Sequence, residues 1–147
     1  NAIGSRHGDL IKGSSGDNEL FGLGGSDNLH GGGGSDHLSG HEGYDNLNGG
    51  DGNDTYRGGA GRDTFVFEGR NFGDDTVLDF SSYDQIVLDG VVDSFSDIDT
   101  DGNGVVNQND KYVNYHNGNL KIYLDAETES ITFNGIAAIA EHDFTIL

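Results

Sequence analysis

Residues 4–66 read GSRHGDLIK, GSSGDNELF, GLGGSDNLH, GGGGSDHLS, GHEGYDNLN, GGDGNDTYR and GGAGRDTFV, which is one nine-residue unit repeated seven times without insertion or deletion. Position 1 of each unit is Gly, and position 4 is Gly in every unit except the first, where it is His7. Position 8 is apolar from Ile11 to Phe65, and position 6 carries Asp9, Asn18, Asp27, Asp36, Asp45, Asp54 and Asp63. Fixed chemistry at four of nine positions predicts a repeat architecture in which every unit forms the same small piece of structure.

The chemistry of the unit predicts a coil made of turns and short strands. Positions 1 to 4 are rich in Gly, so the backbone there can take the positive φ of a sharp turn. The last three residues place one apolar side chain between two others, which is a minimal strand with one inward face. Two units then make one coil, and successive coils stack at the strand spacing of about 4.8 Å. We therefore expect an all-β fold with a parallel β-roll over residues 1–66.

Position 6 is where we expect a cation. In stacked coils the position-6 side chain of one unit lies beside that of the unit two further along, and neighbouring carboxylates repel each other unless a cation lies between them. Calcium suits this gap because it takes about six to eight hard oxygen ligands in irregular geometry, and backbone carbonyls of the turns can supply the remainder. Because the Gly-rich unit buries little apolar surface, the free energy of metal binding becomes free energy of folding.

The unit resembles the calcium-binding nonapeptide of the RTX family. The resemblance implies five sites, each between unit n and unit n+2. Unit n supplies the carbonyls of positions 2 and 4 and the position-6 side chain, and unit n+2 supplies the carbonyls of positions 1 and 3 and its Asp. On this chain three sites would use Leu23, Gly25, Asp27, Gly40, Glu42 and Asp45; Gly32, Gly34, Asp36, Gly49, Asp51 and Asp54; and His41, Gly43, Asp45, Gly58, Ala60 and Asp63. Two N-terminal sites, weakened by His7 and Asn18, would use Ser5, His7, Asp9, Gly22, Gly24 and Asp27, and Ser14, Gly16, Asn18, Gly31, Gly33 and Asp36. Asp79 would close a further half-site at unit seven.

After Val66 the repeat stops, and apolar and β-branched residues become more frequent. Six runs are typical of strands: 64–68, 76–80, 85–89, 112–116, 120–124 and 130–135. Asn117-Gly118 is a typical two-residue hairpin turn between two of them, and the run IAAIAE (136–141) is expected to form a single helical turn. We expect residues 67–147 to form a β-rich cap that covers the open end of the roll and pairs with its exposed strand edge.

A second calcium motif lies within this cap. Residues 99–110 read DTDGNGVVNQND, in which Asp99, Asp101, Asn103, Val105 and Asp110 stand at positions 1, 3, 5, 7 and 12 of an EF-hand loop. Asp replaces the usual Glu at position 12, as it does in dockerin loops, but the strand-like sequence that follows does not favour a dockerin. We expect one calcium ion here, bound more weakly than those in the roll; the alternative is an Asx-rich surface turn without an ion.

Charge and composition exclude several partners. The chain carries 26 acidic and 7 basic residues, a formal charge of −19, so neither nucleic acid nor an anionic membrane surface is an expected partner. It contains no Cys, so calcium rather than disulfides would staple it in a secreted setting. Its apolar runs are all far shorter than the about 18 residues that a membrane span needs.

No catalytic constellation is expected either. The six His residues show no HExxH pattern or close helical pair, and three of them stand at variable positions of the repeats. The sequence has no GxSxG motif, and its Gly-rich tracts lack the Lys and the following helix of a phosphate-binding loop. We therefore expect a module that is not itself an enzyme, although the protein that carries it can be one.

Two further resemblances point to the setting of the module. Residues 58–90 resemble the junction between roll and cap in serralysin proteases and in the R-modules of mannuronan C5-epimerases. The chain ends in DFTIL (143–147), an acidic residue before largely apolar ones, which resembles the C-terminus of proteins exported by Gram-negative type I secretion; a plain last strand is the alternative. These resemblances imply a secreted module, with the type I secretion apparatus and an attached N-terminal domain as partners.

Three functions stay open at this point. The first is a calcium-folded C-terminal module that aids the secretion and folding of the attached domain. The second is a polysaccharide-binding or activity-modulating module of a polysaccharide-modifying enzyme, although only seven basic residues are available to contact a polyanion such as alginate. The third is the terminal segment of a secreted adhesin.

Overall fold

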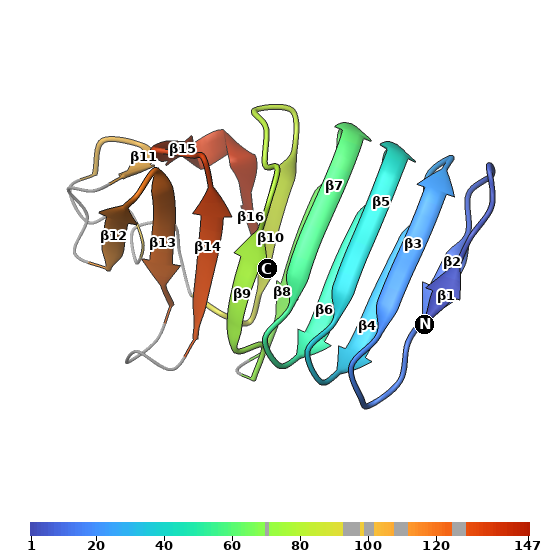
Figure 1. Ribbon diagram of the computed structural model, residues 1–147. Helices are drawn as coiled ribbons and strands as arrows, with labels where there is room; N and C mark the ends of the chain where they lie inside the picture. The colour runs from blue at the N-terminus through green and yellow to red at the C-terminus, as the bar shows by residue number, and fades with distance from the viewer. Residues whose placement is uncertain (70, 93–97, 99–101, 108–111, 125–128) are drawn as a thin grey trace.

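The computed structural model describes residues 1–69, 71–92, 98, 102–107, 112–124 and 129–147. Most of its strands lie in two facing layers, and successive coils of the roll run back and forth between them (Figure 1). One layer begins with β1 (Ala2–Ile3), β3 (Glu19–Gly24), β5 (His37–Gly43), β7 (Thr55–Gly61) and β9 (Asp74–Val77). The other contains β2 (Leu10–Lys12), β4 (Asn28–Gly33), β6 (Asn46–Asp51), β8 (Thr64–Glu68) and β10 (Gln85–Asp89). Neighbours within each layer pair in parallel, so the predicted parallel β-roll is confirmed.

The strands of the roll are longer than the repeat pattern predicts. They continue from the end of one unit through positions 1 to 3 of the next, so that Leu23 pairs with His41 in the same ladder as Leu20 with Leu38. The turn that we expected at positions 1 to 4 is confined to positions 4 to 6, as at Gly25 and Ser26. The physical reason is that parallel pairing needs only backbone groups, so a Gly-rich segment can extend the ladder although it adds no packing.

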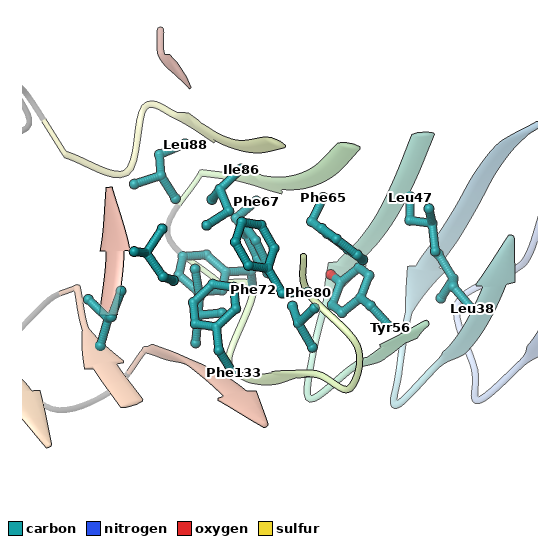
Figure 2. Packing of buried hydrophobic residues seen from close by; sticks show 14 of the residues in the cluster. Leu38, Leu47, Tyr56, Phe65, Phe67, Phe72, Phe80, Ile86, Leu88 and Phe133 are labelled. Atoms are coloured by element: carbon teal, nitrogen blue, oxygen red, sulfur yellow. The ribbon is translucent and has the colours of Figure 1, made fainter. Parts of the chain in front are cut away.

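The core of the roll is one inward residue per unit. The position-8 side chains are all buried: Ile11, Leu20, Leu29, Leu38, Leu47, Tyr56 and Phe65. Aromatic rings then gather at the C-terminal end of the roll (Figure 2). The ring centroid of Tyr56 lies 5.4 Å from that of Phe67, and Phe80 lies 5.4 Å from Phe133, both in edge-on geometry. Apolar stabilisation is therefore concentrated where the repeat ends.

Both layers continue past Val66 with a longer coil. Thr55 pairs with Thr76 and Phe65 with Ile86, which lengthens the offset from 18 to 21 residues. The change after Val66 is thus a change of coil length and side-chain chemistry within continuous sheets. A division into domains at residue 66 stays a prediction.

The cap extends both layers, as predicted. Strand β14 (Ser130–Asn134) pairs in parallel with β9, and β16 (Phe144–Ile146) pairs in parallel with β10. Strands β13 (Asn119–Tyr123) and β12 (Val113–His116) follow antiparallel, so the layers have eight and six strands. The hairpin turn has positive φ at Asn117 (53°) and Gly118 (84°), which confirms the expected two-residue turn.

The expected helical turn at 136–141 is wrong. Residues Ala138–Ala140 form strand β15, which pairs antiparallel with β11 (Val105–Asn107), and the short 3₁₀ helix η2 follows at Glu141–Asp143. The apolar run at 136–140 is too short to have a periodicity of its own, so its partner strand decided the conformation. The described part of the chain holds no helix that is long and apolar enough to cross a membrane.

Candidate metal centre

The position-6 residues form a continuous hydrogen-bonded column, which we call the aspartate ladder. The backbone N–H of each unit's position-6 residue donates to Oδ1 of the aspartate two units further along. Each such pair is one rung, and the N–O distances are 2.8 Å for Asp9–Asp27, 2.7 Å for Asn18–Asp36, 2.8 Å for Asp27–Asp45, 2.7 Å for Asp36–Asp54 and 3.0 Å for Asp45–Asp63. The structure thus brings together the aspartates that the sequence placed between unit n and unit n+2.

Five ladder aspartates keep a second oxygen that has no hydrogen-bond partner among the described residues. Oδ2 is buried and accepts no hydrogen bond in Asp27, Asp36, Asp45, Asp54 and Asp63. Among the described residues, the ion pairs of the carboxylates involve Lys121 with Asp74 and His142 with Asp143, and none reaches the ladder. A buried carboxylate oxygen without a donor or counter-charge is costly, so this column of oxygens fits a bound cation.

The invariant Gly at position 1 is explained by the same oxygens. A Cβ built on Gly22, Gly40 or Gly49 would overlap Oδ2 of the aspartate in its own unit. Any side chain at position 1 would therefore occupy the space beside the open oxygen. By contrast, a Cβ at Gly16 would meet nothing within 4 Å, so glycine there is not required by space.

Backbone strain at position 2 keeps these oxygens open. Leu23 and His41 hold positive φ values of 81° and 76°, which non-glycine residues rarely adopt. In units one and two, Ser5 and Ser14 lie outside that region, and their N–H groups donate to Asp9 Oδ2 and Asn18 Oδ1 at 2.6 Å each. Where position 2 has positive φ, its backbone N–H does not donate to the position-6 carboxylate of the same unit, and Oδ2 stays open.

Burial makes four of the open ladder carboxylates harder to ionise. Burial raises the pKa of Asp54 to about 7 and that of Asp63 to about 6, and it also raises the pKa of Asp36 and Asp45. In each case burial is the largest cause, and hydrogen bonds from the backbone oppose it. A positive ion beside these groups would favour the charged form.

The remaining ligands would come from backbone carbonyls. Carbonyl oxygens of positions 2 and 4 lie close to the next coil, so that a Cβ on Gly50 would overlap the Gly32 oxygen and a Cβ on Gly43 the Gly25 oxygen. Position-3 carbonyls also face the preceding coil, where Glu42 O accepts from Gly25 N at 3.0 Å. No group of three His, Asp or Glu side chains converges within the described residues. Two position-6 side-chain oxygens per site together with carbonyl oxygens would be a hard, all-oxygen donor set, which suits calcium.

The structure shows two ladder members that sequence reasoning missed. Asp54 N donates to Oδ1 of Asp75 at 2.8 Å, and Asp63 N donates to Oδ1 of Asp84 at 2.9 Å. The signal was available in the sequence, because DTV (75–77) and DQI (84–86) repeat the Asp-x-apolar pattern nine residues apart. The coil before Asp75 is three residues longer than the earlier coils, so this pattern is out of phase with the nine-residue repeat.

Asp79 has a different place from the ladder aspartates. Its two oxygens accept the backbone N–H groups of Gly58 at 2.9 Å and Gly59 at 3.1 Å. The carboxylate thus binds the backbone of β7 where unit seven begins. Its role as a calcium ligand stays a prediction.

The predicted loop at 99–110 is described only in part. Asp99, Asp101 and Asp110 lie outside the described residues. Asn103 Oδ1 accepts the backbone N–H of Val105 at 2.8 Å, and Gly102 and Gly104 hold positive φ, so residues 102–105 form a tight Asx turn that leads into β11.

Comparison with known proteins gives a family and a fold. Residues 3–38 and 30–65 match the family described as RTX calcium-binding nonapeptide repeat, in four copies. Among solved structures the chain is similar to the extracellular lipase LipA from Serratia marcescens, with a TM-score of 0.63 and 16% identity. That match covers 99% of this chain and 39% of the lipase, so the chain spans well under half of the lipase's length.

The chain is also similar to the AlgE6R3 subunit of the mannuronan C5-epimerase from Azotobacter vinelandii. That similarity has a TM-score of 0.36 and 24% identity, over 97% of this chain and 80% of the subunit. A search of the curated proteins found no match. The repeat sequence, the stacked coils and the column of open carboxylates agree with the family match: residues 3–65 of this chain belong to the RTX calcium-binding nonapeptide repeats and fold as a parallel β-roll.

Proposed function

We propose that the chain is a calcium-folded module of a secreted protein, with five calcium ions in the roll. The observation that carries this proposal is the set of five buried aspartate oxygens that accept no hydrogen bond. Each of the five sites expected from the sequence contains one of them, supplied by the aspartate of unit n+2. In units one and two the partner side chains, Asp9 and Asn18, already accept a backbone N–H, so the two N-terminal sites would bind most weakly.

Calcium supplies positive charge between coils whose carboxylates otherwise repel one another. The chain's own part is to hold each aspartate by its Oδ1 hydrogen bond, to keep Oδ2 free of donors, and to exclude side chains at position 1. Without the ion the roll keeps buried carboxylates uncompensated, so folding and metal binding are one equilibrium. The chain would stay unfolded at low cytosolic calcium, pass the type I secretion apparatus, and fold outside the cell beside its attached N-terminal domain.

In this proposal the module has no catalytic role of its own. The roll, residues 1–66, binds calcium; the cap, residues 67–147, closes the sheets, contributes the weaker loop site at 99–110 and carries the C-terminal secretion signal. Strand β16 contains Phe144–Ile146 of that segment, so the same residues would serve first in export and then as an edge strand.

Circular dichroism and ion counting test the proposal. In EDTA the chain should lose most of its β structure, and millimolar calcium should restore it, because extracellular modules bind calcium at about 10⁻⁴–10⁻³ M. Magnesium should fail to substitute, because it demands compact octahedral geometry. Native mass spectrometry should find five ions in the 1–92 region and one more at the loop, assigned by comparing the full chain with its Asp99→Ala variant. A native spectrum in EDTA would refute the proposal.

A groove beside the turns of units five and seven and of the coil that follows them supports a second candidate function, the binding of a saccharide. Position 5 of units five and seven carries Tyr44 and Arg62, and Tyr83 precedes Asp84 in the next coil, so these three side chains stack along one edge of the roll. They line a groove of about 590 Å³ together with Gly61, Thr64 and Gln85. Tyr44 and Tyr83 are 71% and 75% exposed. Two exposed rings with an Arg between them offer stacking faces and one cation to a polar ligand.

Calorimetry separates this candidate from the first. Alginate oligomers should release heat on titration into the calcium-loaded chain, and a Tyr44→Ala, Tyr83→Ala double variant should abolish it. Tyr115→Ala is the matched control, because Tyr115 is 41% exposed on β12, outside the groove. No heat with the unchanged chain would remove saccharide binding and leave the calcium proposal intact.

A further inference from the structure

The last two rungs of the aspartate ladder differ from the five before them. Asp75 Oδ1 accepts Asp54 N in the usual way, but its Oδ2 accepts the hydroxyl of Tyr56 at 3.3 Å. That hydroxyl in turn accepts the backbone N–H of Gly49 at 3.0 Å. Tyr56 is fully buried, so its hydroxyl uses both donor and acceptor within the protein.

The next rung is closed in an equivalent way. Asp84 Oδ1 accepts Asp63 N, and Asp84 Oδ2 accepts the backbone N–H of Ser81 at 2.8 Å. Neither Asp75 nor Asp84 therefore offers the open buried oxygen that Asp27 to Asp63 offer. The ladder divides into five open rungs followed by two closed ones.

We propose that the calcium column ends at the Asp45–Asp63 rung, and that the Tyr56 hydroxyl takes the place of the ion between Asp54 and Asp75. The inference rests on the proposed calcium function and states where the ions stop. Among the seven position-8 residues, Tyr56 alone carries a hydrogen-bonding group; Leu47 before it and Phe65 after it cannot reach an aspartate with a donor.

Aromatic side chains around Tyr56 pack against this closed rung. Its ring lies 6.1 Å from Phe65 and 5.4 Å from Phe67, within the aromatic cluster at the junction with the cap (Figure 2). A rung that is both packed by rings and complete in hydrogen bonds can form without metal. Tyr56 thus joins a metal-independent coil to the metal-dependent roll, and this coil is the surface on which the last calcium-binding units stack.

Ion counting gives the first test. Native mass spectrometry in calcium compares the unchanged chain with Asp45→Asn and Asp75→Asn, each of which keeps an oxygen for the backbone N–H. We expect Asp45→Asn to lose at least one ion and Asp75→Asn to lose none. Loss of an ion in Asp75→Asn would overturn the inference and leave the calcium function standing, whereas an unchanged chain without roll ions would refute the calcium function itself.

Hydrogen exchange in EDTA gives the second test, and it does not depend on metal. Amides of β9 and β14 should be protected in the unchanged chain and should exchange about tenfold faster or more in Tyr56→Phe, as expected when a buried hydrogen bond to a carboxylate is lost. Tyr44→Phe is the matched control, because it removes a hydroxyl that is exposed on a turn of the roll. Equal rates in Tyr56→Phe and Tyr44→Phe, or unprotected amides in the unchanged chain, would overturn the inference.

Discussion

The two ends of the roll are built from the same strand pairing but are stabilised by different means. At the N-terminal end the edge strands β1 and β2 are two and three residues long, and Ile3 and Leu10 remain 71% and 70% exposed. At the C-terminal end five-residue strands surround a cluster of buried aromatic rings, and cap strands cover both edges. On the proposed function, the roll depends on bound calcium along most of its length, while one end is held by an apolar core.

The largest difference in calcium-induced folding is expected between a chain that lacks the C-terminal end and a chain that lacks the N-terminal end. Deleting residues 67–147 should abolish calcium-induced folding of the repeats, because coils can grow only on a finished neighbour and the large apolar residues lie in the deleted part. Deleting units one and two should be tolerated. Circular dichroism across a calcium titration is the measurement. A 1–66 fragment that folds at the calcium midpoint of the full chain would show that the two ends are equivalent.

Matched core truncations should sharpen the comparison. Leu20→Ala and Phe133→Ala each remove a fully buried side chain, at a cost of about 2–5 and 3–5 kcal/mol respectively. Leu20→Ala should raise the calcium midpoint and leave the exchange rates of β9 in EDTA unchanged. Phe133→Ala should speed that exchange even without metal. The same response from both variants would mean that metal and apolar core are not separable along the roll.

A smaller effect is expected from one methyl group added at position 1 of a unit, in strand β5. Gly40→Ala places a Cβ where Oδ2 of Asp45 lies and should raise the calcium midpoint about 5- to 150-fold, which corresponds to about 1–3 kcal/mol of lost binding free energy. Gly16→Ala is the control, because its Cβ would lie in open space and its φ is not positive. Isothermal titration with calcium measures the midpoints of both variants. Equal midpoints would contradict the hypothesis that the ion occupies the space beside Oδ2.

The smallest effect should come from the loop in the cap. Asp99→Ala should raise the calcium midpoint modestly and leave the final folded content unchanged, because the loop site is the weaker one and the cap packs without it. A calcium titration followed by circular dichroism checks both quantities. A loss of folded content would mean that the loop ion holds the cap together. The C-terminal end would then depend on metal as well.

Much of the fold and of the site could be predicted from the repeat alone. Fixed Gly, Asp and apolar positions specify the stacked coils, the alignment of the aspartates and the core, and the Asn-Gly turn specified the cap hairpin; the role of the aspartates as calcium ligands stays a prediction. The strand at Ala138–Ala140 could not be predicted, because so short an apolar run takes its conformation from β11. Asp75 and Asp84 were missed because a three-residue insertion broke the period, and the role of the Tyr56 hydroxyl depends on contacts between coils that no local pattern contains.

The two layers of the roll also constrain how its length can change. Because the position-8 residues of odd and even units lie in different layers, deleting unit six alone would transfer every later strand to the opposite sheet and separate Tyr44 from Arg62 and Tyr83. Deleting or duplicating a pair of units, such as 22–39, preserves every register on both sides and changes the length of the molecule by about 4.8 Å. The roll can therefore be lengthened in evolution or by design only in whole coils, each of which brings its own pair of metal ligands.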